Sequence, residues 1–342
     1  MLGSCEEPLA RAYDVALLDL DGVVYVGDAP VPEAASAIEA ARAAGQRIAF
    51  ITNNASRSPA KVAEKIRRIG VPADPAEVVT SAQAAARVLL ERHGTGARIV
   101  TLGAAGLREA LTAAGLEPVG VDDGDAVSLV TGYGPDVVWR DVMRAAVRVR
   151  DGLPWVASNT DGTIPTAFGI APGHGVMVRM LSDFTDVSPV VAGKPERPLF
   201  DETIERTGAR RPLMVGDRLD TDIEGATHAG IDSLLVMTGV TGLPDLVAAA
   251  PRLRPTYLAA DLRGLLAPQS APSVDGQGWV AGDWTATVAD GRLTTAGTGD
   301  PSDWWRCVAA AAWSALDDSG TVVDVSGVRP PEAAPATGTL PA

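Results

Sequence analysis

Residues 14–22 read DVALLDLDG, a short apolar run that ends in Asp19, Asp21 and Gly22. The apolar run predicts a buried strand, and its acidic end predicts a turn. Two carboxylates spaced two positions apart on an extended segment point roughly the same way and repel each other, which favours a bound divalent cation. A solvated acidic turn would have the same sequence, so the rest of the chain must decide between these interpretations.

Short apolar runs alternate with helical patterns along most of the chain, and this alternation predicts parallel sheets with helices on their faces. The predicted strands are 14–20, 47–51, 78–80, 98–103, 128–133, 155–159, 190–195, 213–217 and 233–239. The predicted helices are 32–44, 58–69, 81–93, 104–114, 136–149, 174–182, 197–207, 220–229 and 243–250. We therefore expect an α/β protein with a doubly wound parallel sheet.

Polar side chains follow three further predicted strands, at the point where each strand ends. They are Thr52, Asn53 and Asn54 after 47–51, Lys194 in a Gly-Lys-Pro tripeptide, and Asp217 with Asp222 in VGDRLDTD. Because the carboxyl ends of parallel strands meet at one edge of such a sheet, we expect these side chains to gather there. The positively charged side chain of Lys194 among hydroxyls, amides and carboxylates favours a functional site over a solvated turn.

The segments LLDLDGVVY, ITNNAS, GKP and VGDRLDTDI resemble, in order and spacing, the four motifs of the haloacid dehalogenase superfamily. The resemblance is best to the class IIA phosphatase branch, which carries a large α/β cap and includes nitrophenylphosphatase-like, phosphoglycolate and glycerol 3-phosphate phosphatases. It implies a catalytic core made of residues 1–95 and 188–267. Residues 96–187 would form the cap, which closes over the site and selects the substrate.

The resemblance also implies a role for each motif residue. Asp19 would be the nucleophile that forms an aspartyl-phosphate, and Asp21 would be the general acid and base. Mg²⁺ would be held by Asp19, by the main-chain carbonyl of Asp21 and by Asp217, with Asp222 in support. Thr52, Asn53 and Asn54 would hold the phosphoryl oxygens.

The charges of these groups agree with such roles. A carboxylate that attacks a phosphate dianion faces a repulsion of about 4 kcal/mol per charge pair at 4 Å in an effective dielectric of 20. Mg²⁺ and Lys194 would have to offset that repulsion as the transition state forms. Dehalogenases of the superfamily lack an acid at the position of Asp21, so its presence favours phosphoryl transfer.

The loop after the predicted strand 155–159 is the candidate for recognising the leaving group. It offers Asn159 and Asp161 as hydrogen-bonding partners for a small polyol. The expected substrate is a small phosphorylated metabolite, glycerol 3-phosphate first and 2-phosphoglycolate second. A nucleotide, pyridoxal or sugar phosphatase with the same chemistry is the alternative. For His174, packing is the simpler interpretation and substrate contact the alternative.

Composition limits the other classes of protein. The 342 residues are 46% hydrophobic and 21% charged, which is typical of a globular protein. The net charge of −14 argues against a nucleic-acid partner, and the lack of a long apolar run argues against a membrane span. Two cysteines and an acidic start without a signal peptide favour a cytoplasmic protein. Assembly into a homo-oligomer stays open.

Residues beyond 267 have a different pattern. We expect a linker at 268–278, a small ββαβ unit at 279–328 and a disordered tail at 329–342. The unit is rich in tryptophan and resembles, weakly, half of an N-acetyltransferase fold, without that fold's loop for coenzyme A. A regulatory or binding role is one interpretation, and a packing or dimer-contact unit with core tryptophans is the simpler one. Removal of these residues would leave all four motifs intact.

Overall fold

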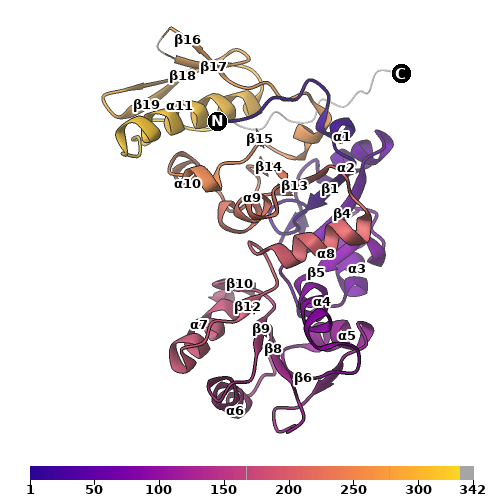
Figure 1. Ribbon diagram of the computed structural model, residues 1–342. Coiled ribbons are helices and arrows are strands. Elements are labelled where there is room, and N and C mark those ends of the chain that lie inside the picture. Colours follow the sequence, from indigo (N-terminus) through magenta and orange to yellow (C-terminus); the bar gives the residue numbers. More distant parts are fainter. Residues whose placement is uncertain (167, 277, 332–342) are drawn as a thin grey trace. The chain divides into compact units, whose positions relative to one another are not determined.

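The computed structural model describes residues 1–331 except 167 and 277 (Figure 1). Residue contacts divide the chain into two compact units. Unit 1 comprises Met1–Ile48, Ile69–Val71 and Ala209–Ala342, and unit 2 comprises Ala49–Arg68 and Pro72–Gly208. The predicted division into catalytic core and cap stays a prediction, because contacts alone do not identify a cap. Most of the predicted disordered tail lies outside the described residues.

Unit 1 contains a parallel sheet in the order β15-β14-β13-β1. The strands are β1 (Val15–Leu18), β13 (Pro212–Gly216), β14 (Asp232–Val236) and β15 (Tyr257–Ala259). All four residues of β1 are buried, as the apolar run predicts. The remaining small elements are β2 (Tyr25–Val26), β3 (Ala29–Pro30), α1 (Leu9–Ala12), α2 (Ala34–Ala43), η2 (Leu219–Ile223), α9 (Glu224–Ala229), α10 (Leu243–Val247), η3 (Pro251–Leu253) and η4 (Leu262–Leu266).

Unit 2 has its own parallel sheet in the order β12-β9-β8-β6-β7. Its strands are β6 (Arg98–Leu102), β7 (Glu117–Val119), β8 (Ser128–Thr131), β9 (Trp155–Ala157) and β12 (Val190–Val191). The strand β4 (Arg47–Thr52) begins in unit 1, ends in unit 2 and pairs in parallel with β5 (Val78–Thr80). The helices are α3 (Pro59–Arg68), α4 (Ser81–His93), α5 (Ala105–Ala113), α6 (Trp139–Arg150), α7 (His174–Thr185) and α8 (Arg197–Thr207). The α/β fold class is confirmed.

Some short strands escape the sequence patterns. In unit 2 these are β7 and the antiparallel hairpin of β10 (Thr163–Thr166) and β11 (Gly169–Pro172). Each of the three contains a proline, which lacks an N–H group and weakens a strand pattern. Pairing with a neighbouring strand, parallel with β6 for β7 and antiparallel within the hairpin, forms these elements in spite of their composition.

The C-terminal part of unit 1 differs in detail from the predicted ββαβ unit. It is an antiparallel sheet, β16 (Ser273–Asp275), β17 (Gly278–Ala281), β18 (Trp284–Ala289) and β19 (Arg292–Gly297), followed by α11 (Pro301–Ser319). The predicted linker therefore contains a strand. The single strand expected at 279–288 is divided at Gly282, whose φ of +53° breaks the extended backbone. The final expected strand is reduced to one bridge between Asp324 and Arg292.

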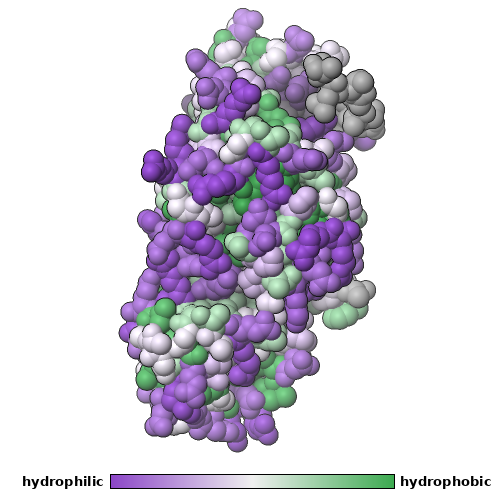
Figure 2. Space-filling model, turned by 90° about the vertical axis from the view of Figure 1, so that its right-hand side faces the viewer, coloured by the Kyte–Doolittle hydropathy of each residue, from purple (hydrophilic) through white to green (hydrophobic). Residues whose placement is uncertain are grey.

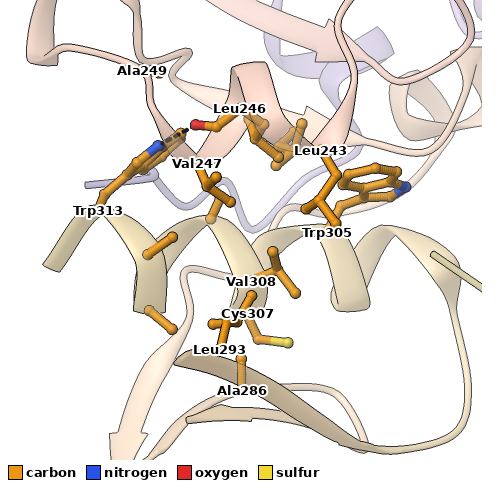
Figure 3. Packing of buried hydrophobic residues seen from close by; sticks show 14 of the residues in the cluster. Leu243, Leu246, Val247, Ala249, Ala286, Leu293, Trp305, Cys307, Val308 and Trp313 are labelled. Atoms are coloured by element: carbon orange, nitrogen blue, oxygen red, sulfur yellow. Dashed lines mark hydrogen bonds between the residues drawn. The ribbon is translucent and has the colours of Figure 1, made fainter. Parts of the chain in front are cut away.

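The tryptophans of α11 are core residues (Figure 3). Trp304, Trp305 and Trp313 lie in one hydrophobic cluster with apolar residues of α10, β14, β15 and the C-terminal sheet. The indole N–H of Trp313 donates to the carbonyl of Leu246 at 2.7 Å, so its one polar atom is satisfied. The interpretation of these tryptophans as packing residues is confirmed.

Polar residues cover most of the face shown in Figure 2, with small apolar patches between them. Within the described part of the chain, no helix combines the length and the apolar character needed to cross a membrane.

Candidate active site

Three carboxylates gather in unit 1. Asp19 directly follows β1, Asp217 directly follows β13, and Asp222 lies in η2. The two strands are parallel neighbours, with Leu18 opposite Val215, so both aspartates leave the same edge of the sheet. One oxygen from each of the three carboxylates lies within 4.8 Å of the others. We name these three residues the acidic group.

The acidic group is buried: Asp19 is 8% exposed, and Asp217 and Asp222 are 0% exposed. Three ionised carboxylates this close repel one another, and burial strengthens the repulsion because the protein interior has a lower dielectric constant than water. Main-chain N–H groups offset part of this, since Val240 donates to Asp217 at 2.6 Å and Arg218 to Asp222 at 3.1 Å. Carboxylate oxygens that point toward one another are hard, anionic ligands, and they suit a divalent cation such as Mg²⁺.

Glycines leave space for the acidic group. A β-carbon on Gly22 would lie 2.3 Å from Oδ2 of Asp217, and one on Gly239 would lie 2.0 Å from the same atom. Gly22 also has a φ of +87°, which other residues rarely adopt. These two positions therefore admit glycine alone while Asp217 keeps its place.

Asp21 has a different environment. Its side chain is exposed and lies outside the acidic group. A tight turn follows it, in which the N–H of Gly22 donates to the carbonyl of Tyr25 at 2.7 Å. The predicted contact of Asp21 with a metal is through its main-chain carbonyl, and it stays a prediction. The exposure of its side chain suits a group that exchanges protons with a substrate or with water.

Sequence reasoning missed the loop that follows β14. Val240 donates to Asp217, and the hydroxyl of Thr238 donates to the carbonyl of Gly22 at 2.6 Å. The loop thus holds both the carboxylate of Asp217 and the turn after Asp21. The signal that was available is the segment TGVTG at 238–242, which overlaps the end of the predicted strand 233–239, because residues at the carboxyl end of a parallel strand lie at the edge where site residues gather.

In unit 2, the side chain of Asn53 is the centre of a second cluster. Its Nδ2 donates to Oδ1 of Asp161 at 2.9 Å and to the carbonyl of Lys194 at 3.0 Å, and its Oδ1 accepts from the N–H of Lys194 at 2.7 Å. Nδ2 of Asn159 donates to the carbonyl of Asn53 at 2.8 Å. We name Asn53, Asn159, Asp161 and Lys194 the amide network.

The amide network fixes Lys194. The pairing of β12 with β9 brings 192–194 beside 158–159, and Ala192 donates to Ala157 at 2.9 Å. A β-carbon on Gly193 would lie 2.6 Å from Oδ1 of Asn53, which explains the glycine of the Gly-Lys-Pro tripeptide. Lys194 is 3% exposed, and a buried ammonium needs anionic partners. The structure thus joins two predicted site residues, Asn53 and Lys194.

The other two residues of the predicted amide and hydroxyl group make local contacts. Oδ1 of Asn54 accepts from the N–H and the hydroxyl of Ser56, both at 2.9 Å, and so stabilises the turn before α3. Oγ1 of Thr52 accepts from the N–H of Asn54 at 3.1 Å. Their predicted contacts with phosphoryl oxygens stay predictions.

Asn159 and Asp161, predicted to contact the leaving group, both bond to Asn53. Asn159 is 4% exposed, and its Oδ1 also accepts from the N–H of Asp161 at 3.2 Å. The loop therefore supports the amide network. Its predicted role in recognition stays a prediction.

Comparisons with known proteins define the class. A model of haloacid dehalogenase-like hydrolases matches residues 16–117, and a second HAD-hydrolase-like model matches residues 191–265. These ranges contain every residue of the acidic group, together with Asn53 and Lys194. The chain belongs to the haloacid dehalogenase-like hydrolases, and it is a phosphatase.

Individual relatives have narrower names. D-glycerol 3-phosphate phosphatase of Mycobacterium tuberculosis is 40% identical over 316 residues, which are 90% of this chain and 88% of the relative. Acid sugar phosphatase of Staphylococcus aureus is 36% identical over 259 residues, which are 75% of this chain and 98% of the relative.

Solved structures agree with these matches. The magnesium complex of the mycobacterial glycerol phosphate phosphatase has a TM-score of 0.82 and 40% identity, and it covers 90% of this chain and 92% of that one. The 4-nitrophenylphosphatase of Thermotoga maritima has a TM-score of 0.70 and 29% identity over 75% of this chain and 98% of that one. The resemblance to class IIA phosphatases is confirmed.

Proposed function

We propose that the chain hydrolyses the phosphomonoester of a small metabolite, with glycerol 3-phosphate as the first substrate and 2-phosphoglycolate as the second. The observation that carries this proposal is the acidic group, three buried carboxylates whose oxygens lie within 4.8 Å of one another. The name of the mycobacterial relative supports the choice of glycerol 3-phosphate.

We infer Mg²⁺ as the cofactor. The oxygen donors of the acidic group and the magnesium complex of the mycobacterial structure support this choice. Asp19 and Asp217 would hold the ion through their carboxylates, Asp21 would hold it through its carbonyl, and Asp222 would complete the negative surroundings. A bound Mg²⁺ would neutralise charge that develops on the phosphoryl oxygens.

The chain's own residues would act in two steps. In the first, an oxygen of Asp19 forms a bond to phosphorus while the bond from phosphorus to the leaving oxygen breaks, and Asp21 gives its proton to that oxygen. In the second, Asp21 takes a proton from water, the water oxygen attacks phosphorus, and the bond to Asp19 breaks to release inorganic phosphate. Each step thus conserves its atoms and its protons.

Lys194 and the residues at the end of β4 would bind the phosphoryl group. Asn53 uses both amide hydrogens within the protein. We therefore assign its side chain to the orientation of Lys194, and assign the phosphoryl contacts of this segment to the Thr52 hydroxyl and to main-chain N–H groups. Lys194 supplies a compact positive charge, which suits phosphate oxygens.

Other substrates of the same chemistry form the second candidate. The acid sugar phosphatase match supports a sugar phosphate, and nucleotides and pyridoxal phosphate follow. A purely regulatory role of the C-terminal unit has less support, because its buried tryptophans serve as core residues and offer no open aromatic surface for a ligand.

A phosphate-release screen tests the proposal. The substrates are glycerol 3-phosphate, 2-phosphoglycolate, a hexose phosphate, a nucleoside monophosphate, pyridoxal phosphate and 4-nitrophenyl phosphate. We expect the highest kcat/KM for glycerol 3-phosphate, loss of turnover with a chelator and recovery on addition of Mg²⁺.

The variant Asp19→Asn keeps the size of the nucleophile and removes its charge. We expect no turnover from it and an unfolding temperature at or above that of the parent, since it removes one of three repelling charges. Hydrolysis by Asp19→Asn near the parent rate would refute the mechanism. A higher kcat/KM of the parent for hexose phosphate than for glycerol 3-phosphate would refute the proposed substrate.

A further inference from the structure

His174 is buried in unit 2, and within the described part of the chain it forms a hydrogen bond through one of its two ring nitrogens. It is 4% exposed, and its Nδ1 lies 2.8 Å from the carbonyl oxygen of Asn159. A carbonyl oxygen only accepts, so Nδ1 carries the proton and donates. Nε2 is buried and has no hydrogen-bond partner among the described residues. Burial of an unsatisfied nitrogen is unfavourable, so packing alone is a poor reason for histidine here.

The two neighbours of His174 bring it close to the loop at 159–162. A β-carbon on Gly173 would lie 2.3 Å from the carbonyl oxygen of Asp161, and one on Gly175 would lie 2.1 Å from that of Thr160. The N–H of Gly175 donates to the Asp161 carbonyl at 2.8 Å, and that of Gly173 donates to the Gly162 carbonyl at 3.0 Å. The Gly-His-Gly tripeptide at the start of α7 is therefore bonded to this loop along its whole length.

The same loop carries two members of the amide network. Asn159 donates to the carbonyl of Asn53, Asp161 accepts from the side chain of Asn53, and Asn53 bonds to both main-chain groups of Lys194. A series of hydrogen-bonded residues thus runs from His174 through Asn159 and Asn53 to Lys194, in which the main chain and side chain of each asparagine make successive contacts. A shift of the Asn159 carbonyl would be passed to the residues at the end of this series.

We propose that His174 is a positioning residue whose Nδ1–H holds the 159–161 loop, and through it Asn53 and Lys194, in the arrangement that binds the phosphoryl group. The inference rests on the proposed function, since it assumes that Lys194 binds phosphate. It assigns no contact between His174 and the substrate. The imidazole suits this role because burial lowers the pKa of His174 to about 4, which keeps the ring neutral near pH 7.

Two substitutions distinguish the roles of the two ring nitrogens of His174. The amide nitrogen of an asparagine lies about where Nδ1 lies, whereas that of a glutamine reaches about as far as Nε2. We expect His174→Asn to keep kcat/KM within about twofold of the parent. We expect His174→Gln and His174→Ala to lower kcat/KM for every phosphate ester by about tenfold or more, because they lose the bond to Asn159. His228→Gln, which changes an exposed histidine, is the matched control and is expected to match the parent.

Binding of inorganic phosphate gives a readout that does not depend on turnover. Its dissociation constant, measured by titration calorimetry on each variant at pH 7.5, should rise about tenfold for His174→Gln and stay near the parent for His174→Asn. A residue that only stabilises the fold would lower the unfolding temperature without this ordering of phosphate affinities.

The possible failures are distinguishable. If the parent binds and releases phosphate, and a folded His174→Gln binds it equally well, the role of His174 is refuted and the proposed function stands. If a folded His174→Asn loses as much affinity as His174→Gln, the role of Nδ1–H is refuted. If the parent neither hydrolyses phosphate esters nor binds phosphate, the proposed function and this inference both fail.

Discussion

At the scale of single residues, the carboxylate of Asp217 lies where two neighbouring residues have no room for a β-carbon. Gly239→Ala would place that carbon 2.0 Å from Oδ2 of Asp217, so the carboxylate must move. We expect this variant to bind Mg²⁺ at least tenfold more weakly than the parent, as measured by the Mg²⁺ dependence of turnover and by titration calorimetry.

The matched control for this prediction is Gly242→Ala, three residues further along the same loop. The nearest heavy atoms to a β-carbon on Gly242 are 3.5 Å away, which is ordinary contact. We expect this control to keep the parent's Mg²⁺ affinity. Equal affinities for the two variants would mean that the acidic group tolerates displacement of Asp217, and that the metal does not depend on it.

His174 also predicts how stability depends on pH. Burial lowers its pKa from 6.5 to about 4, so between these values the unfolded chain binds a proton that the native chain does not. The free energy of unfolding therefore decreases as pH falls through this window, by about 2 kcal/mol at pH 5 from this one group. We expect urea unfolding at pH 7 and pH 5 to show this loss in the parent and a smaller loss in His174→Asn. An equal loss of unfolding free energy in the parent and in His174→Asn would contradict the assignment of this pH dependence to His174.

Sequence patterns predict which residues gather at the end of the sheet in the acidic group, but they do not predict the hydrogen bonds of the amide network. Asp19 and Asp217 each end a buried run, and a parallel sheet brings such ends together, so the acidic group was predictable. The bonds of Asn53 with Lys194 join residues 141 positions apart and depend on how β4, β9 and β12 end in space. No local pattern carries that information, and the phosphate contact of Asn53 that the resemblance implies stays a prediction.

At the scale of elements, α11 packs on both of its sides, as Figure 3 shows. Trp313 is 0% exposed, donates to Leu246, and lies 5.2 Å below the guanidinium of Arg254. We expect Trp313→Ala to lower the free energy of unfolding by about 3–5 kcal/mol, because it leaves a cavity and removes the hydrogen bond from the indole N–H to Leu246. Chemical denaturation of the full chain measures this change.

Trp139 provides the comparison. It also belongs to a helix, as the first residue of α6, but it is 60% exposed. We expect Trp139→Ala to change the free energy of unfolding by about 0.5 kcal/mol or less. Similar losses for the two tryptophans would contradict the assignment of α11 to the core of unit 1.

The longer elements were predictable, whereas several of the shortest were not. The helix predicted at 81–93 is α4 in the structure, where Thr80 and Gln83 form a capping box at its start. By contrast, the two-residue strands β2 and β3 and the proline-containing hairpin form only because a partner strand lies beside them. Pairing of this kind is a property of the folded chain and leaves little trace in its composition.

At the scale of the whole molecule, the C-terminal sheet and α11 are part of unit 1. The cluster that contains the α11 tryptophans also contains Leu2, Leu219, Leu235 and Leu258. Main-chain bonds join Cys5 and Gln269 in both directions, at 2.7 and 2.8 Å, and Arg306 donates to the carbonyl of Leu258 at 2.9 Å. The staphylococcal relative aligns almost completely with 75% of this chain, so phosphatase members of the family exist without a counterpart to the remaining quarter.

These contacts change what removal of the C-terminal residues should do. The four motifs end before residue 268, which by itself suggests that a chain ending at Ala267 keeps its chemistry. That chain would instead expose apolar residues that α11 covers, among them Leu243, Leu246, Val247 and Leu258. A patch of this kind promotes aggregation. Loss of the packing of three buried tryptophans, at about 3–5 kcal/mol each, is comparable to the whole stability of a typical domain, about 5–15 kcal/mol.

We therefore expect a chain ending at Ala267 to be poorly soluble or to unfold without a cooperative transition, and to have lost most of its turnover. A chain ending at Val328 is the control, because it keeps every residue of the cluster, and we expect it to unfold and to hydrolyse phosphate esters like the parent. Size-exclusion chromatography, thermal unfolding and phosphate release, measured on both chains, give the comparison. If the chain ending at Ala267 is monomeric, unfolds cooperatively and hydrolyses at the parent rate, then α11 covers a surface that the phosphatase part can leave open to water.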